Sequence, residues 1–121
     1  DYWILKELDL TNINVICCEY NHYLGNNVKM TIPYNPNHKF NNDGCHGASL
    51  KAFSELLDSK GFNLIAVESS GTNAFFVKKK FSHYFEVLSD SESWKSVDRN
   101  NSLERINYIK NSIKKFKFYE L

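Results

Sequence analysis

The order of three segments constrains this chain more than any other feature of its sequence. Residues 13–20 are apolar except for Asn14 and Glu19, a pattern typical of a strand covered on both faces in a parallel α/β sheet. A helical pattern follows at residues 49–60, and residues 62–78 then read as two strands joined by a tight turn. We therefore expect an α/β fold in which a strand, a helix and a β-hairpin follow one another.

The helix predicted at residues 49–60 has a signal at each end. Ser49 is a favourable N-cap, and Gly61 suits the left-handed conformation that ends many helices. The apolar stripe of this helix consists of Leu50, Phe53, Leu56 and Leu57. Together with the returning strand at residues 74–78, it predicts that the core contains Phe53, Leu56, Phe75 and Val77.

The other segments give weaker patterns. Residues 2–10 predict a short amphipathic helix that Asp1 caps, and residues 28–32 predict a brief edge strand within the long polar loop at residues 21–43. Residues 102–118 predict a basic helix. The polar stretch at residues 82–101 has scattered apolar anchors, which are Tyr84, Phe85, Val87, Leu88 and Trp94.

Composition places the chain among small folded domains. Its 121 residues are 42% hydrophobic, which argues against disorder, and its net charge of +1 creates no field that would attract nucleic acid. Three cysteines, two of them adjacent, do not form a disulfide framework, so we expect a cytoplasmic setting. No apolar run reaches the roughly 20 residues that span a bilayer, and no signal peptide is evident.

Five short motifs suggest a family. EYN at 19–21, PYNP at 33–36, GAS at 47–49, KGF at 60–62 and SSGTNAFFV at 69–77 together resemble bacterial proteins related to FkbM-type methyltransferases. The resemblance covers roughly residues 1–80 and the second half of such a domain. It implies a Rossmann-like, small mixed sheet of three or four strands, with a methyltransferase-like core at residues 1–81. Residues 82–121 would form a helical C-terminal extension packed on the same domain.

The resemblance also implies a cofactor, S-adenosylmethionine. Asp1 looks like the last residue of the family's acidic motif and is therefore a candidate cofactor ligand. In such folds the cofactor lies on the first strand-to-helix turn, yet no G-x-G-x-x-G or equivalent occurs in the 121 residues. Methyl transfer to a small or sugar-like acceptor would then require an upstream segment, and we expect the chain alone to be inactive.

Polar residues follow the first buried strand, where open α/β sheets bind their ligands. Glu19, Asn21 and His22 are catalytic candidates because a carboxylate beside an imidazole suits acid–base chemistry, and Tyr20 is a candidate for substrate binding. The alternative is that Glu19 only pairs with backbone or a lysine at the end of the strand.

Three further residues are candidates for substrate binding. His46 and Ser49 lie at the start of the predicted helix, where anions bind, although Ser49 as a plain N-cap is the favoured reading. Asn73 lies in the hairpin turn, which the resemblance places near the substrate. Cys45, His46 and His22 match no common zinc pattern, so we expect no metal site.

Two functions from different classes remain open. The first is the methyltransferase part already described, and the second is a non-catalytic interaction module that kept the sheet and lost the chemistry. A glycine-rich strand–turn–helix encoded before Asp1 would favour the enzyme. The basic tail reads as the solvated face of a helix, so nucleic-acid binding is not expected. Because residues 15–18 lack the neighbour that a complete sheet would supply, we expect a homodimer.

Overall fold

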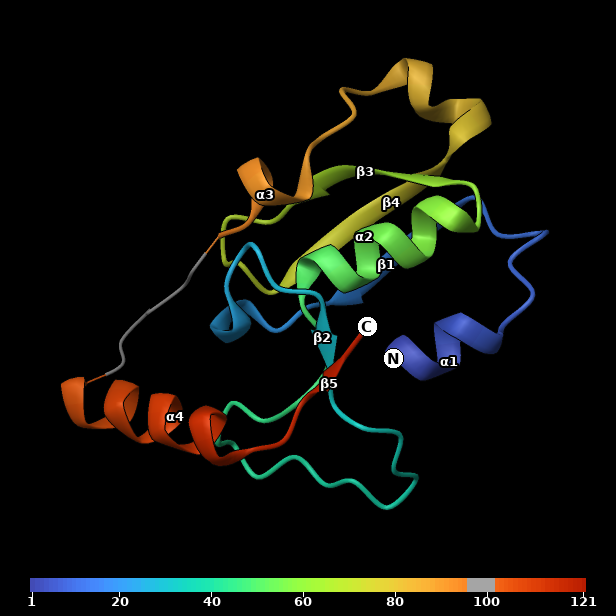
Figure 1. Ribbon diagram of the computed structural model, residues 1–121. Helices are drawn as coiled ribbons and strands as arrows, with labels where there is room; N and C mark the ends of the chain where they lie inside the picture. Colours follow the sequence, from blue (N-terminus) through green and yellow to red (C-terminus); the bar gives the residue numbers. More distant parts are fainter. Residues whose placement is uncertain (96–101) are drawn as a thin grey trace.

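The computed structural model describes residues 1–95 and 102–121. Its centre is a three-stranded sheet with the order β1 (Val15–Glu19), β4 (Asn73–Lys78), β3 (Phe62–Val67) (Figure 1). Both pairs are antiparallel, so β1 and β3 run in the same direction on either side of β4. The predicted succession of strand, helix and hairpin is confirmed. The expectation of a mixed sheet is wrong, because hydrogen-bonded neighbours in the described sheets are all antiparallel.

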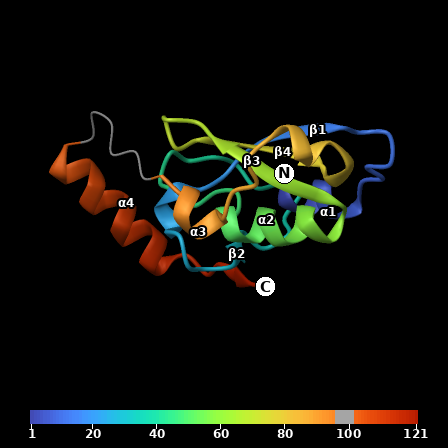
Figure 2. The same ribbon diagram turned by 90° about the horizontal axis from the view of Figure 1, so that it is seen from above.

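Helix α2 (Leu50–Ser59) covers one face of this sheet (Figure 2). The hydroxyl of Ser49 accepts a hydrogen bond of 3.2 Å from the N–H of Ala52, so Ser49 is the N-cap as predicted. Gly61 ends the helix at φ +88°, a conformation that side chains with a Cβ disfavour. The core between helix and sheet includes Leu50, Phe53, Leu57, Leu64 and Phe76.

Alternation along β4 decides which of its side chains reach this core. Phe76 is fully buried against the helix side, whereas the neighbouring Phe75 points to the other face and is half-buried. The predicted burial of Phe53 and Val77 is confirmed. The predicted burial of Phe75 is wrong, whereas Leu56 is half-buried and packs against the core.

The opposite face of β1 is open to solvent. Ile16 and Cys18 are buried, but Val15 is 58% exposed and Cys17 is exposed as well. The expectation that this strand is covered on both faces is therefore wrong. Helices α1 (Tyr2–Glu7) and α2 lie on the same side of the sheet, and the apolar run of β1 reflects a single buried face (Figure 2).

Helix α1 (Tyr2–Glu7) is shorter than the predicted span of residues 2–10. Asp1 occupies the N-cap position, but its side chain makes no capping hydrogen bond. The ring of Tyr2 is buried and meets Phe53 of α2 edge-on, with 5.9 Å between ring centroids. The indole N–H of Trp3 donates to the carbonyl of Ile32 at 2.8 Å, so α1 is fixed to both α2 and the polar loop.

The predicted edge strand at residues 28–32 is confirmed in a shorter form. After the 3₁₀ helix η1 (His22–Leu24), strand β2 (Met30–Thr31) pairs antiparallel with β5 (Tyr119–Glu120) at the end of the chain. This small second sheet ties the C-terminus to the polar loop. It leaves β1 as an edge strand of the main sheet.

The basic helix predicted at residues 102–118 is α4 (Leu103–Lys115). Ser102 caps it through a hydrogen bond of 3.1 Å from the N–H of Arg105, and the chain leaves the helix before β5. Ile109 is its buried residue and packs on Gly44 of the polar loop. A Cβ at Gly44 would lie 2.7 Å from Cγ2 of Ile109, so close packing there requires glycine.

The segment after β4 contains the 3₁₀ helix η2 (Lys79–Tyr84) and helix α3 (Asp90–Ser93). Of the anchors predicted in residues 82–101, Leu88 and Trp94 pack against the core. The prediction is wrong for Tyr84, Phe85 and Val87, whose side chains are exposed. Residues 96–101 of that stretch lie outside the described residues. None of the helices in the described ranges is both long and apolar enough to cross a membrane.

Candidate functional site

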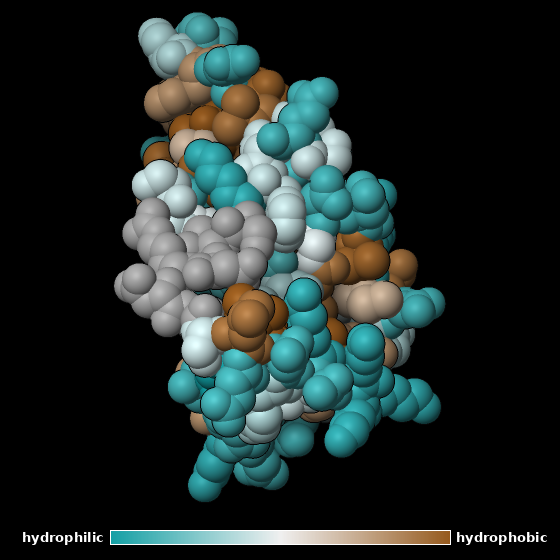
Figure 3. Space-filling model, turned by 90° about the vertical axis from the view of Figure 1, so that its left-hand side faces the viewer, coloured by the Kyte–Doolittle hydropathy of each residue, from teal (hydrophilic) through white to brown (hydrophobic). Residues whose placement is uncertain are grey.

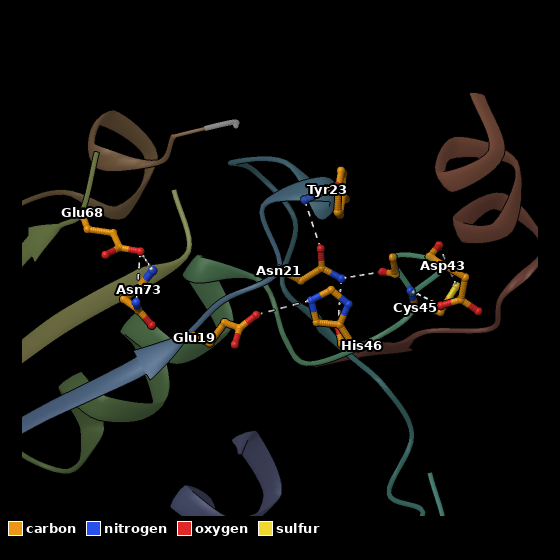
Figure 4. A network of polar contacts seen from close by, with 9 residues as sticks. Glu19, Asn21, Tyr23, Asp43, Cys45, His46, Glu68 and Asn73 are labelled. Carbon is orange, nitrogen blue, oxygen red and sulfur yellow. Dashed lines mark hydrogen bonds and ion pairs between the residues drawn. The ribbon is translucent and has the colours of Figure 1, made fainter. Parts of the chain in front are cut away.

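The carboxyl ends of β1 and β3 lie at the same end of the sheet, on either side of β4. We call this end the carboxyl edge (Glu19–Asn21 and residues 68–73). Glu19 ends β1, and Glu68 directly follows β3; because the two strands run in the same direction, both residues lie there. Glu19 is also in register with Asn73 of β4. The carboxyl edge thus brings together the predicted candidates Glu19, Asn21 and Asn73 (Figure 4).

Asn21 is fully buried and uses its amide within the chain. Its Nδ2 donates to the carbonyls of Gly44 at 2.7 Å and His46 at 2.8 Å, and its Oδ1 accepts from the N–H of Tyr23 at 3.0 Å (Figure 4). These three bonds join the end of β1 to the loop before α2. Asn21 therefore acts on His46 by positioning it, and its amide has no donor left for a ligand.

Tyr20 is buried beside it and points toward the segment after α3. Its hydroxyl donates to the carbonyl of Lys95 at 3.0 Å, and burial raises the pKa of the phenol. The phenol thus holds residue 95 against the sheet. The structure does not place Tyr20 in the cavity described below.

Asn73 is bound to the carboxylate next to it. Oε1 of Glu68 accepts hydrogen bonds from Nδ2 of Asn73 at 3.0 Å and from its backbone N–H at 3.2 Å, and the Ser70 hydroxyl donates to the same oxygen. Glu68 thereby closes the turn between β3 and β4. The sequence offered Gly71 and Asn73 as turn residues, and the part played by Glu68 was missed.

Two other candidates lie away from a cavity. Ser49 is fully buried, and its hydroxyl accepts from the N–H of both Met30 and Ala52 at 3.2 Å, so the N-cap also holds β2 beside the helix. His22 begins η1, and its ring stacks on Tyr23 with 4.0 Å between centroids. Neither residue lines the cavity that contains His46.

A cavity of about 360 Å³ opens between the start of α1, the end of β1 and the polar loop. Three predicted site residues from separate segments, Asp1, Glu19 and His46, line it together. The sequence had not predicted its remaining wall, which comprises Tyr2, Trp3, Thr31, Ile32, His38, Phe40 and Gly47. The available signal was the unusual length of the loop at residues 21–43, which contributes Thr31, Ile32, His38 and Phe40.

His46 and Glu19 are the facing ionisable groups of this cavity. Nε2 of His46 lies 4.0 Å from Oε1 of Glu19, with the imidazole side chain 23% exposed and the carboxylate 57% exposed. Phe40 meets the imidazole edge-on at 5.1 Å. Burial lowers the pKa of His46, and His38 lowers it further, while the carboxylates of Glu19 and Asp43 act in the opposite direction. The imidazole is therefore neutral at pH 7.

Each of the imidazoles of His46 and His38 has one buried ring nitrogen without a hydrogen bond. Nδ1 of His46 and Nε2 of His38 are both buried, and neither has a hydrogen-bond partner in the described parts of the chain. Buried polar atoms usually have partners, so a site with two orphaned nitrogens is unusual. Both belong to residues that line the same cavity.

None of the three cysteines, all of them described residues, lines this cavity. Cys45 is buried, its thiol pKa is raised by burial to about 11, and its sulfur contacts the carbonyl of Asp43 at 3.9 Å. Within residues 1–95 and 102–121, no three His, Cys, Asp or Glu side chains are grouped in a way that could hold a metal ion.

Comparison with known proteins finds no relative of this chain. No protein-family model matches the chain, and no curated protein or solved structure is significantly similar to it.

Proposed function

We propose that this chain is the acceptor-side part of a methyltransferase-like domain, and that its cavity binds a small or sugar-like molecule with a hydroxyl group. The observation that carries the proposal is the convergence of Asp1, Glu19 and His46, which sequence reasoning had selected separately, on one cavity of about 360 Å³. Its position beside the end of β1 agrees with ligand binding beyond the carboxyl ends of strands.

The connection of the strands supports the same proposal. β1 leads through α2 into β3, which runs in the same direction, and β4 returns between them. Strand, helix and hairpin in this order are what the resemblance to FkbM-type methyltransferases implies for the end of the sheet. A Rossmann-like complete sheet is part of the proposal and would continue from the free edge of β1.

The described residues do not fit S-adenosylmethionine itself. The start of α2 is capped by Ser49 and fully buried, so its N–H groups are closed to a ligand. The turn at residues 69–72 is used to close the hairpin, and the sequence has no glycine-rich loop. The cofactor would have to be bound by a different segment, and the proposal therefore assigns this chain only the acceptor and its proton.

His46 and Glu19 suit the removal of a proton from a hydroxyl group. A hydroxyl group has one proton, which it can donate to the unprotonated Nε2, and Oε1 of Glu19 lies 4.0 Å from that nitrogen. The neutral imidazole then accepts the proton, and the carboxylate of Glu19 stabilises the imidazolium that forms. The aromatic rings of Trp3 and Phe40 offer flat apolar walls for a sugar ring.

A titration with simple methyl glycosides tests the proposal on the chain of 121 residues. We expect a saturable change in the imidazole NMR signals of His46, weakened in Glu19→Gln. The matched control is His83→Gln, which changes an exposed histidine of η2 and should bind like the unmodified chain. If no glycoside shifts the His46 signals up to its solubility limit, the acceptor site does not exist.

The alternative, a non-catalytic interaction module, also has an observation in its favour. The outer face of β1 exposes Val15 and Cys17, and Ile13 before it is 40% exposed. A module would use this surface and would not depend on His46. Glycoside binding that His46→Gln abolishes therefore favours the acceptor site. No glycoside binding by the unmodified chain, together with self-association that Val15→Lys disrupts, favours the module.

A further inference from the structure

The cavity that contains His46 has negative charge in its wall. Its lining includes the carboxylates of Asp1 and Glu19, and no lysine or arginine of residues 1–95 and 102–121 belongs to it. Lys39 lies next to two lining residues in the chain, but its own side chain is exposed and is not part of the wall. A ligand in this cavity therefore meets a negative electrostatic potential.

The two carboxylates have different surroundings. Oε1 of Glu19 faces Nε2 of His46 at 4.0 Å (Figure 4). The side chain of Asp1 makes no capping hydrogen bond to α1, and within the described ranges no lysine or arginine forms an ion pair with it. Glu19 thus serves the imidazole, whereas the carboxylate of Asp1 is available to a ligand.

Aromatic rings form another part of the wall. Trp3 and Phe40 both line the cavity, and Phe40 is 63% exposed, so a ligand can reach its ring. The faces of such rings attract cations. One cation of the chain already uses this property: Nζ of Lys6, from outside the lining, lies 5.2 Å from the centroid of the Trp3 ring. Carboxylates and aromatic rings together are the groups that bind an ammonium ion.

The basic residues near the C-terminus lie elsewhere. Helix α4 carries Lys110, Lys114 and Lys115, which are exposed and outside the lining of the cavity. Hydrophilic side chains gather on the lower part of the face shown in Figure 3, where this helix lies. The small net charge of +1 thus hides a separation, with positive charge on α4 and negative charge in the cavity.

We propose that the acceptor carries an ammonium group besides its hydroxyl, as an amino sugar does, and that the carboxylate of Asp1 binds this group. This inference rests on the proposed acceptor site, in which the hydroxyl faces His46 and Glu19. An ammonium group has three donors and a carboxylate only accepts, so the two form charge-assisted hydrogen bonds. The same charges disfavour an acceptor that carries a phosphate or carboxylate.

A set of methyl glucosides separates the ammonium group from the sugar ring. The probes carry an amino group at carbon 2 or carbon 6, and their N-acetyl derivatives and methyl glucoside are the neutral references. The N-terminus is acetylated, so that Asp1 contributes its carboxylate and no α-amino charge. At pH 7 we expect one of the amino glucosides to bind about tenfold more tightly than the neutral probes, measured through the imidazole NMR signals of His46.

Variants identify the group responsible for this preference. Asp1→Asn should lower the affinity for the amino glucoside to that for methyl glucoside. Glu7→Gln is the matched control, because it removes an exposed carboxylate of the same helix that does not line the cavity. It should keep the full preference. Asp1 is exposed as well, so neither variant should disturb the fold.

The possible failures are distinguishable. Equal affinities for the amino and neutral glucosides would overturn this inference and leave the proposed acceptor site standing. A preference for an amino glucoside that Asp1→Asn leaves unchanged would also overturn it, because another group would then bind the ammonium. Binding of none of the probes would remove the acceptor site itself, and this inference with it.

Discussion

The side-chain amide of Asn21 donates a hydrogen bond of 2.8 Å to the backbone carbonyl of His46. Asn21 is fully buried, and the same nitrogen also holds Gly44 at 2.7 Å. The end of β1 therefore determines where the imidazole lies, although the two residues are 25 positions apart in the chain. This link between sheet and loop is what allows Glu19 and His46 to face each other across the cavity.

Removing this amide should destabilise the protein. Asn21→Ala leaves the carbonyls of Gly44 and His46 and the N–H of Tyr23 without their partner. We expect the free energy of unfolding in urea to fall by about 3 kcal/mol, since each buried unsatisfied group costs about 1–3 kcal/mol. Asn26→Ala is the control, because its hydrogen bond is exposed and 3.4 Å long. Equal stability of the two variants would show that solvent replaces the Asn21 bonds.

The core around α2 should be the least tolerant part of the molecule. Phe53 of α2 is fully buried, and its ring packs against Tyr2 of α1. Phe53→Ala is expected to lower the free energy of unfolding by about 3–5 kcal/mol, because a cavity remains where the ring was. Leu103→Ala, at a side chain that is 80% exposed, should change it by less than about 0.5 kcal/mol. A loss below about 1 kcal/mol for Phe53→Ala is incompatible with this packing.

The buried imidazole should make stability depend on pH. Burial lowers the pKa of His46 in the native state below the value of about 6.5 that it has in the unfolded chain. Between these two values the unfolded chain binds more protons, so unfolding takes up a proton. The free energy of unfolding should therefore start to fall as the pH drops through about 6.5. It should continue to fall until the pH reaches the pKa of His46 in the native state.

Unfolding in urea at about pH 7.5 and about pH 5.5 measures this contribution. His46→Gln should show a smaller loss between the two conditions than the unmodified chain. His83→Gln, at an exposed position, should keep the full loss. An identical loss in the unmodified chain and in His46→Gln would mean that His46 titrates normally.

The 121 residues should not bind S-adenosylmethionine with useful affinity. They contain no glycine-rich loop, and the start of α2 is buried. Isothermal titration calorimetry of the isolated chain should show no saturable heat. A dissociation constant in the low micromolar range would instead require a binding site that this fold does not reveal.

The elements that sequence reasoning located well are those with local signals. Helix α2 has a stripe of apolar residues, Ser49 before it and Gly61 after it, and these depend only on residues close in the chain. The hairpin of β3 and β4 likewise follows from a short turn. Elements that depend on distant partners were located poorly: β5 pairs with β2 across about ninety positions, and two residues contain no pattern that predicts such a pairing.

The faces of the strands show a second limit. Val15 and Cys17 are as apolar as Ile16 and Cys18, so the sequence of β1 does not show which side is covered. Between β3 and β4, the register shifts between Leu64 and Ala66. Phe75 and Phe76 are adjacent and equally apolar, so the sequence does not show which of the two faces the core. For the site, Glu19 and His46 were recognisable as residue types. Their meeting depends on the course of the loop between them, which has no periodicity.

The middle strand of the sheet is the last of the three to leave the ribosome. β1 pairs with β4 at Val15 and Val77, so about sixty further residues must be synthesised after β1 before its partner strand exists. Until then neither β1 nor β3 has a neighbour, and the sheet forms in one late step. Contacts this distant in the chain slow folding, and the unpaired strands are exposed to aggregation in the meantime. A nascent chain halted before Asn73 would therefore hold α1 and α2 without a sheet to pack on.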